Sequence, residues 1–366
     1  MNPHPLFCPN PHCPSGGQQN QGNLRLHDGI RQRWRCRTCG KTFSHRQGTA
    51  FSGLKTPEKV VIQVITLLAF GCPLQAIVQA FGFDERTVKA WQDKAGQHCQ
   101  SVHTALVEQS NLSLQQVQAD EVRVRLQKRV VVWMAMALCV PTRFWLGGVT
   151  SQHRDRSLLH DLAARVKACA RLEPLLLVSD GLASYVSAWR KTFRTPLQTG
   201  KRGRPRLLTW PGLVIGQMVK QYQKGRVVDI DQRLVQGSIE ELHVCLPEES
   251  KISTAYIERL NATVRSRLAC LTRRGRALGR VPQTISRGMY LVGCLYNFCT
   301  PHHSLSQQQP TTPAMASGLA QGVWSLGDLL WYRVALPSVV TPKRRGRPPK
   351  SQAVVTQGGD RVVTTS

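Results

Sequence analysis

Residues 253–268 read STAYIERLNATVRSRL, and their apolar side chains recur at steps of three and four residues. This spacing predicts a helix with one buried face. Glu258, Asn261 and Arg265 follow the same period beside that face, so an acid, an amide and a base share one side of the predicted helix. Such a group suits a site for a metal ion and a phosphate. A solvated salt-bridge face would have the same local pattern, so the rest of the chain must decide between the two interpretations.

The charge of the chain indicates a polyanionic partner. Its 366 residues include 49 lysines and arginines against 21 aspartates and glutamates, which gives a net charge of +28. This excess predicts attraction to nucleic acid, with a membrane surface as the weaker alternative. The longest apolar run, residues 130–140, is too short to span a membrane, and the first residues lack the pattern of a secretion signal. At this length we expect more than one structural unit.

Cysteine spacing predicts a zinc ribbon at residues 1–48. Cys8 and Cys13 form one close pair and Cys36 and Cys39 another, whereas the other cysteines are scattered through apolar segments. This distribution favours a reducing compartment with one metal site over a disulfide framework. Four thiolates from two such knuckles can bind one Zn2+ tetrahedrally in a structural site. The first knuckle is wider than the second, and His12 inside it is an alternative ligand. The arginines of the segment predict contact with DNA.

Residues 54–100 predict a small helical DNA-binding unit. The apolar periodicity indicates three helices, and Gly82 separates the second from the third. Two short helices joined by a tight glycine turn have the geometry of a helix-turn-helix, whose second helix enters the major groove. We therefore expect Arg86, Thr87 and Lys89, early in the third helix, to contact DNA. A plain helical bundle is the alternative.

The pattern changes to strands in the long middle of the chain, residues 112–300. Alternation of apolar and polar residues, followed by two apolar runs, predicts three antiparallel strands joined by short turns. An amphipathic helix and a continuous apolar strand come next. The expected strands cover residues 114–126, 130–140, 144–150 and 172–180, and the expected helix covers residues 155–171.

Two aspartates occupy unusual positions in these strands. Asp120 lies inside the first strand, and Asp180 ends the fourth, at the carboxyl edge of the sheet, where α/β proteins bind ligands. A carboxylate there is costly to bury without a partner. Together with Glu258 they form a set of acids that repel one another unless a divalent cation neutralises them, and oxygen ligands favour Mg2+ or Mn2+. Two such ions can activate the attacking oxygen and stabilise the leaving oxygen of a phosphodiester.

Other acids are weaker candidates. Glu121 adjoins Asp120 but points to the opposite face of a regular strand. Asp155 opens a predicted helix, where the helix dipole favours an acid in any case. Glu240 and Glu241 fall in a loop-like region and are interpreted as solvated.

The order of these elements resembles a known family. Three strands, a helix and a fourth strand, with acids at these places, resemble the ribonuclease-H-like core of DDE transposases and integrases. IERLNATVRSRLACLTRRGRA at residues 257–277 resembles the glutamate helix of transposases of the insertion-sequence-one family, and QRWRCRTCGKTF at residues 32–43 resembles their second zinc knuckle. YNFCTPHHSL at residues 296–305 and TTPAMASGL at residues 311–319 resemble the tail of related bacterial transposases.

The resemblance implies that Asp120, Asp180 and Glu258 form the catalytic triad and bind the metal ions. It also implies that Arg265 is the basic residue two turns after the glutamate, and that Asn261 has a supporting role. The wider first knuckle departs from the family pattern. In the founding family the two halves are commonly encoded in overlapping frames, whereas here they are continuous.

The implied fold is a multidomain α/β protein. After the ribbon and the helix-turn-helix unit, it has a ribonuclease-H-like mixed sheet with helices on both faces at residues 112–302. A C-terminal segment follows at residues 303–336, and a basic tail, predicted to be disordered, at residues 337–366.

Two basic segments carry the sequence Arg-Gly-Arg-Pro. One lies in a basic insert near residues 198–208 and contains Arg202 and Arg204, and the other lies in the tail and contains Arg345 and Arg347. Both resemble the core of an AT-hook, in which an extended arginine pair lies along a narrow minor groove. For the internal copy, a loop that binds phosphates nonspecifically is an equal alternative.

Together these features predict a DNA transposase that binds the ends of an insertion sequence and catalyses DNA cleavage and strand transfer. The predicted cofactors are Mg2+ (or Mn2+) at the catalytic site and structural Zn2+. The predicted partners are double-stranded DNA and further copies of this chain, without a membrane, and the predicted location is the nucleoid in the cytoplasm of a prokaryote. A catalytically inactive, transposase-derived DNA-binding regulator is the alternative, and a plain nuclease on the same core is a third interpretation.

Overall fold

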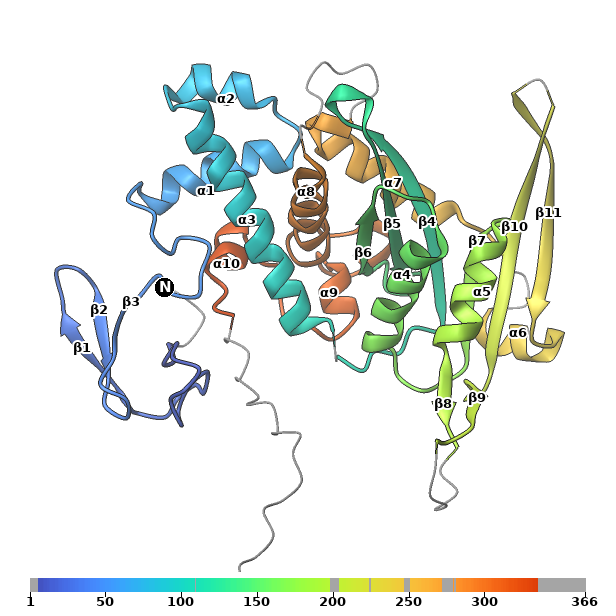
Figure 1. Ribbon diagram of the computed structural model, residues 1–366, viewed down its shortest axis with the longest axis horizontal. Coiled ribbons are helices and arrows are strands. Elements are labelled where there is room, and N and C mark those ends of the chain that lie inside the picture. Colours follow the sequence, from blue (N-terminus) through green and yellow to red (C-terminus); the bar gives the residue numbers. More distant parts are fainter. Residues whose placement is uncertain are drawn as a thin grey trace, which may run out of the picture.

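Figure 1 shows the computed structural model of the chain, which describes residues 6–108, 110–197, 204–223, 225–246, 251–271, 279 and 281–334. Within these residues the fold is α/β, with ten α-helices, a mixed six-stranded sheet and two smaller sheets. The predicted tail, with Arg345 and Arg347, lies outside the described residues, as does Arg202 of the basic insert. None of the helices in the described part has the length and apolar character needed to cross a membrane.

The central sheet has the strand order β11-β10-β7-β4-β5-β6. β4, β5 and β6 form the predicted antiparallel meander, whereas β7 is parallel to β4 and β10 is parallel to β7. β11 pairs antiparallel with β10 and forms one edge of the sheet. The strands are β4 (Gln116–Arg125), β5 (Val131–Cys139), β6 (Trp145–Ser151), β7 (Leu175–Asp180), β10 (Leu213–Gln223) and β11 (Arg226–Gln236).

Helices cover both faces of the sheet, and two neighbouring residues of β4 identify which helix lies on which face. Successive side chains of a strand point to opposite faces. Asp120 contacts α7, whereas the next residue, Glu121, contacts α5. α8 packs on the Asp120 face with α7, and α4 packs beside α5 on the Glu121 face. The bounds are α4 (Arg156–Cys169), α5 (Ala183–Thr192), α7 (Ala255–Arg267) and α8 (Pro282–Cys294).

Three helices that precede the sheet pack into the same core. One continuous cluster of buried apolar side chains joins them to the sheet, to α7, to α8 and to α10. α3 lies directly against α8, because a side-chain carbon added at Gly96 would lie 2.5 Å from the carbonyl oxygen of Arg287. The C-terminal half of α3 is buried in this core, so the helix runs beyond the predicted end of the unit at residue 100. The bounds are α1 (Glu58–Ala69), α2 (Leu74–Phe81), α3 (Glu85–Leu106) and α10 (Leu326–Trp331).

The N-terminal ribbon is a three-stranded antiparallel sheet that lies to one side of the main body (Figure 1). It is held there by the last described residues. Arg333 is buried and donates hydrogen bonds to the carbonyl oxygens of His45 and Gln47, and the ring of Trp331 stacks on His45. Because α10 also contacts α1 and α3, the C-terminal segment ties the ribbon to the helical unit. The strands are β1 (Leu24–Asp28), β2 (Arg33–Cys36) and β3 (Thr42–Ser44).

The sequence pattern does not predict the elements between α5 and α7. β10 and β11 form a long hairpin that projects from the sheet (Figure 1), and β8 (Arg194–Pro196) pairs with β9 (Leu207–Thr209) beside the basic insert. Glu240 and Glu241 lie not in a loop but in α6 (Ile239–Cys245), where Glu241 forms a capping box with Ser238. Both acids are exposed, as expected of solvated residues.

We expect a buried histidine of α3 to make the stability of the fold sensitive to mild acid. His103 is fully buried beside the rings of Trp145 and Tyr290, with centroid distances of 4.9 and 5.4 Å. Burial, and then the charge of Arg165, lower the pKa of His103 to about 3. Its contribution to stability is therefore complete above the unfolded pKa of about 6.5 and is lost progressively as the pH falls from there.

We expect the substitution His103→Phe to reduce this acid sensitivity. At pH 5 the loss of unfolding free energy from this histidine is about 2 kcal/mol. Phenylalanine keeps an aromatic ring in the core but does not titrate, so the free energy of unfolding should fall less between about pH 7.5 and pH 5 than in the wild type. Urea unfolding at the two pH values measures this difference. Equal losses in the two proteins would show that His103 does not cause the effect.

Candidate active site and metal centres

The end of β7 brings two of the predicted aspartates together. β7 pairs with β4 only as far as Gln118 and Val178, and it ends at Asp180, while β4 continues to Arg125. One carboxylate oxygen from each of Asp120, Glu121 and Asp180 lies within 4.8 Å of the others. The site therefore lies at the carboxyl end of β7, beside the middle of β4. Asp180 ends its strand and Asp120 lies inside its strand, both as predicted.

Asp120 is the most strongly perturbed carboxyl of the group. Its Oδ2 accepts a hydrogen bond of 2.7 Å from the amide of Asn261, and its Oδ1 accepts one of 2.8 Å from the backbone N–H of Glu121. Burial, and then the negative charge of Glu121, raise the pKa of Asp120 to about 6, and the charges of Asp180 and Glu258 add to the rise. A cation between the carboxylates would remove this repulsion.

Glu121 belongs to the cluster although it comes from the other face of the strand. Its carboxylate is buried, accepts a hydrogen bond of 2.7 Å from the hydroxyl of Tyr185 and forms an ion pair with Arg154, whose Nε lies 2.6 Å away. Arg154 also lies 3.6 Å from Asp180. Strand alternation correctly predicts the face of Glu121. It does not predict that the carboxylate of Glu121 lies close to that of Asp180. The two carboxylates can approach each other because β7 ends at Asp180.

The helix at residues 253–268 forms as predicted and is anchored to β4. Ile257, Leu260 and Val264 are buried along one face of α7. The side chain of Gln118, two residues before Asp120 and on the same face of β4, accepts hydrogen bonds of 3.0 Å from the backbone N–H groups of Tyr256 and Ile257. These N–H groups have no partner within the helix, so the buried glutamine fixes the start of α7 against β4.

Glu258 lies on α7 but outside the compact group of acids. Its Oε1 accepts hydrogen bonds of 2.6 Å from Lys220 of β10 and 2.7 Å from Thr254. Partial burial acts to raise the pKa of Glu258, but the hydrogen bonds from Lys220 and Thr254 outweigh it and lower the pKa. The structure therefore groups Asp120 with Asp180, whereas it pairs the glutamate with a lysine.

The other two predicted residues of α7 differ in their surroundings. Asn261 is buried and donates to Asp120, which gives it a direct positioning role at the site. Arg265 is partly exposed and forms no ion pair with Glu258, nor with another carboxylate in the described part of the chain. Its predicted role as a phosphate contact stays a prediction.

The four predicted zinc ligands converge in the ribbon. The Sγ atoms of Cys8, Cys13, Cys36 and Cys39 all lie within 4.8 Å of one another. The Cys8–Cys39 and Cys13–Cys36 sulfur distances are 3.6 and 3.9 Å. A tetrahedron with Zn–S bonds of about 2.3 Å has edges of about 3.8 Å, so the cluster fits one structural Zn2+. His12 is exposed and outside the cluster, so the four cysteines alone are the candidate ligands.

Gly40 and Gly16 explain how the two knuckles close around the metal site. Gly40 has φ +73°, a conformation that favours glycine, and its N–H donates to the carbonyl of Cys36. Gly16 approaches the backbone of the wider first knuckle, where an added side-chain carbon would lie 2.3 Å from the carbonyl oxygen of Asn10.

Metal analysis of the purified protein tests this site. We expect one zinc per chain in the wild type and none in Cys36→Ser, because three thiolates leave the tetrahedral site open. His12→Ala should keep its zinc. Cys72→Ser, which changes a cysteine outside the cluster, is the matched control and should also keep it. Full zinc content in Cys36→Ser would contradict the assignment.

The residues predicted to contact DNA lie at the start of α3. Gly82 has φ +69° and forms the turn between α2 and α3, and Asp84 caps α3 by accepting from the N–H of Arg86. Arg86 is exposed and Thr87 partly exposed. Lys89 forms an ion pair of 2.9 Å with Asp93, so it is less available than the pattern predicts. Arg204, the part of the internal AT-hook motif that the structure describes, is exposed.

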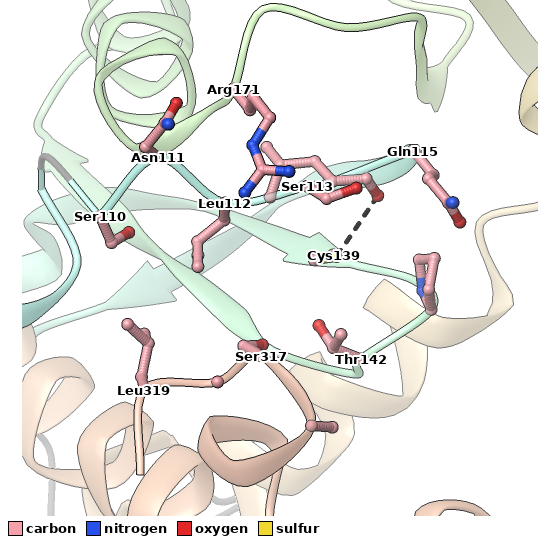
Figure 2. Close-up of a pocket in the computed structure, with 14 residues that line it drawn as sticks. Ser110, Asn111, Leu112, Ser113, Gln115, Cys139, Thr142, Arg171, Ser317 and Leu319 are labelled. Carbon is pink, nitrogen blue, oxygen red and sulfur yellow. Dashed lines mark hydrogen bonds between the residues drawn. The ribbon is translucent and has the colours of Figure 1, made fainter.

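A separate pocket of about 390 Å3 lies where β4 begins, at the opposite edge of the sheet from Asp180 (Figure 2). Figure 2 shows Arg171 at its rim, and the thiol of Cys139 donates to the carbonyl of Leu114 at 3.4 Å. Its lining contains no carboxylate and no histidine. This pocket therefore lacks the groups that the acidic site provides.

Comparison with known proteins adds no family to these findings. The chain matches no protein-family model, and no curated protein matches it significantly.

Proposed function

We propose that this protein is a DNA transposase that uses Asp120 and Asp180 for metal-dependent cleavage and strand transfer. The observation that carries the proposal is the convergence of the two carboxylates, one from the middle of β4 and one from the end of the neighbouring parallel strand β7. Hard oxygen ligands close together, one of them with a pKa raised to about 6, are suited to bind Mg2+ or Mn2+. Such ions can activate an attacking oxygen and stabilise a leaving oxygen in phosphodiester displacement.

The arrangement of elements supports a ribonuclease-H-like core. An antiparallel meander is followed by a helix, a parallel strand next to the first strand, and a further parallel strand, with α7 packed across the first strand. In that core the acids come from the first strand, the fourth strand and a later helix, which matches the places of Asp120, Asp180 and Glu258. The turn at Gly82 and the exposed Arg86 support a helix-turn-helix in front of it.

The residues around the acids would prepare the site for substrate. Asn261 and the N–H of Glu121 hold the Asp120 carboxylate by its two oxygens. Arg154 pairs with Glu121 and lies beside Asp180, so it limits the repulsion within the group before a cation binds. Glu258 would complete the site after leaving its ion pair with Lys220.

The proposed assembly contains more than one copy of the chain, because two DNA ends must be held together. The β10–β11 hairpin is the surface that best supports this part of the proposal. β11 is an edge strand, and Val227, Val228 and Ile230 are exposed on it at 46%, 57% and 49%. A long exposed edge with apolar side chains is suited to pair with another strand.

The second candidate function is a DNA-binding regulator without catalysis. The ion pair between Lys220 and Glu258 favours it, because the glutamate is engaged outside the group of aspartates. This candidate predicts the same affinity for DNA with or without divalent ions and no strand cleavage.

Cleavage of a supercoiled plasmid that carries the ends of the element tests the proposal. With Mg2+ we expect Asp180→Asn and Glu258→Gln to lose roughly 100-fold or more in cleavage rate, because each removes a carboxylate from the reacting centre. Glu240→Gln makes the same chemical change at an exposed acid of α6 and should cleave like the wild type. If Asp180→Asn cleaves at the wild-type rate, the proposed site is wrong.

A further inference from the structure

α7 has a second polar side, turned away from the acids. Tyr256, Thr263 and Arg267 lie about half a turn around the helix from Glu258 and Arg265. They line a cavity of about 170 Å3, closed on the other side by residues of the β5–β6 turn and of the segment after α8. The residues that matter here are Arg143, Arg259 and Arg267, with Tyr256, Tyr296 and His302, and we call this the arginine pocket.

No carboxylate in the described part of the chain neutralises the positive charge of the arginine pocket. None of its arginines forms an ion pair with a carboxylate among the residues that the structure describes, and no acid lines the cavity. This charge affects the neighbouring histidine. Burial, and then the positive charges of Arg143 and Arg259, lower the pKa of His302. Burial also lowers the pKa of Arg267, as expected of a desolvated cation.

Arg143 occupies this place at a conformational cost. Its φ is +56°, a left-handed conformation that residues other than glycine and asparagine rarely adopt. Its guanidinium lies 3.7 Å from the centre of the Tyr256 ring, and its Nε is buried with no hydrogen-bond partner in the described part of the chain. A strained backbone combined with an unsatisfied buried donor indicates a functional constraint rather than a gain in stability.

We propose that the arginine pocket binds a phosphate group of the DNA backbone. The cavity is below the roughly 300 to 1,000 Å3 of sites for drug-sized molecules, so it suits a small anion rather than a whole nucleotide. Guanidinium groups are the preferred partners of phosphate oxygens. A helix is about 10 Å across, so a strand held at the acids could reach the pocket over the exposed side of α7. The inference rests on the proposed function in one respect, namely that DNA is the polyanion that the protein binds.

Variants of the pocket arginines and a matched control outside the pocket separate phosphate binding from folding. Arg143→Asn removes the charge, and asparagine tolerates the left-handed backbone better than arginine, so the thermal stability should rise or stay unchanged. Arg129→Asn makes the same change at the other end of β5, where the exposed Arg129 also has a positive φ, of +61°. Arg259→Gln changes an exposed helical position of the pocket, and the double variant Arg143→Asn/Arg259→Gln combines both losses.

Binding of a short fluorescent DNA duplex by the zinc-loaded protein, without added Mg2+ or Mn2+ and over a range of salt concentrations, tests the inference without catalysis. We expect the double variant to bind about tenfold more weakly than the wild type, with the slope of log K against log salt reduced by about 0.9 for one lost phosphate contact. Arg129→Asn should bind like the wild type. Equal affinity and slope for the double variant and the wild type would overturn the inference, as would an equal loss in Arg129→Asn.

A second measurement identifies the source of the phosphate. If the pocket serves the DNA backbone, the short duplex should raise the melting temperature of the wild type, relative to the double variant, more than inorganic phosphate does at matched ionic strength. A rise confined to the wild type that is as large with inorganic phosphate as with the duplex would assign the pocket to a free phosphate and overturn the DNA assignment. The binding assay contains no catalytic metal ion, so it does not depend on cleavage. A protein that fails to cut DNA with Mg2+ but shows the expected binding difference would therefore refute the catalytic proposal alone.

Discussion

The repulsion between carboxylates at the end of β7 is the constraint on which the site depends. β7 ends at Asp180 beside the longer strand β4, so the carboxylates of Asp120, Glu121 and Asp180 lie close together. Burial and the neighbouring negative charge raise the pKa of Asp120 to about 6. Like charges this close are stable only with protons, a cationic side chain or a metal ion among them. Arg154 supplies part of that compensation, and a divalent ion would supply the rest.

The packing of α7 turns this electrostatic arrangement into a defined geometry. Gln118 binds the first turn of the helix, and Asn261 binds Asp120 a little more than one turn later, so strand and helix are joined at two points on one face. The same helix places Glu258 beside Lys220 and carries Arg259 and Arg267 on its other side. α7 therefore contacts both the acidic site and the arginine pocket, as the proposed path of a DNA strand over its exposed side requires.

Patterns with a strong period predicted much of the fold. The meander, α4, α7 and the cysteine cluster follow from alternation, helical spacing and paired cysteines. The hairpin β10–β11 was not predicted because β11 is almost entirely exposed, so no buried face imposes a period on its residues. Glu121 and Lys220 were missed for a different reason: their partners, Arg154 and Glu258, are distant in sequence, and the contacts form only after the sheet has brought them together.

Metal binding tests the central claim most directly, because it requires neither a DNA substrate nor turnover. The zinc-loaded protein would be titrated with Mn2+, and the free ion followed by electron paramagnetic resonance. Saturable binding is predicted for the wild type and for Glu240→Gln. Binding should be lost or at least about tenfold weaker in Asp120→Asn and Asp180→Asn, because each removes a ligand. Equal Mn2+ affinity in all four proteins would contradict a metal site between β4 and β7.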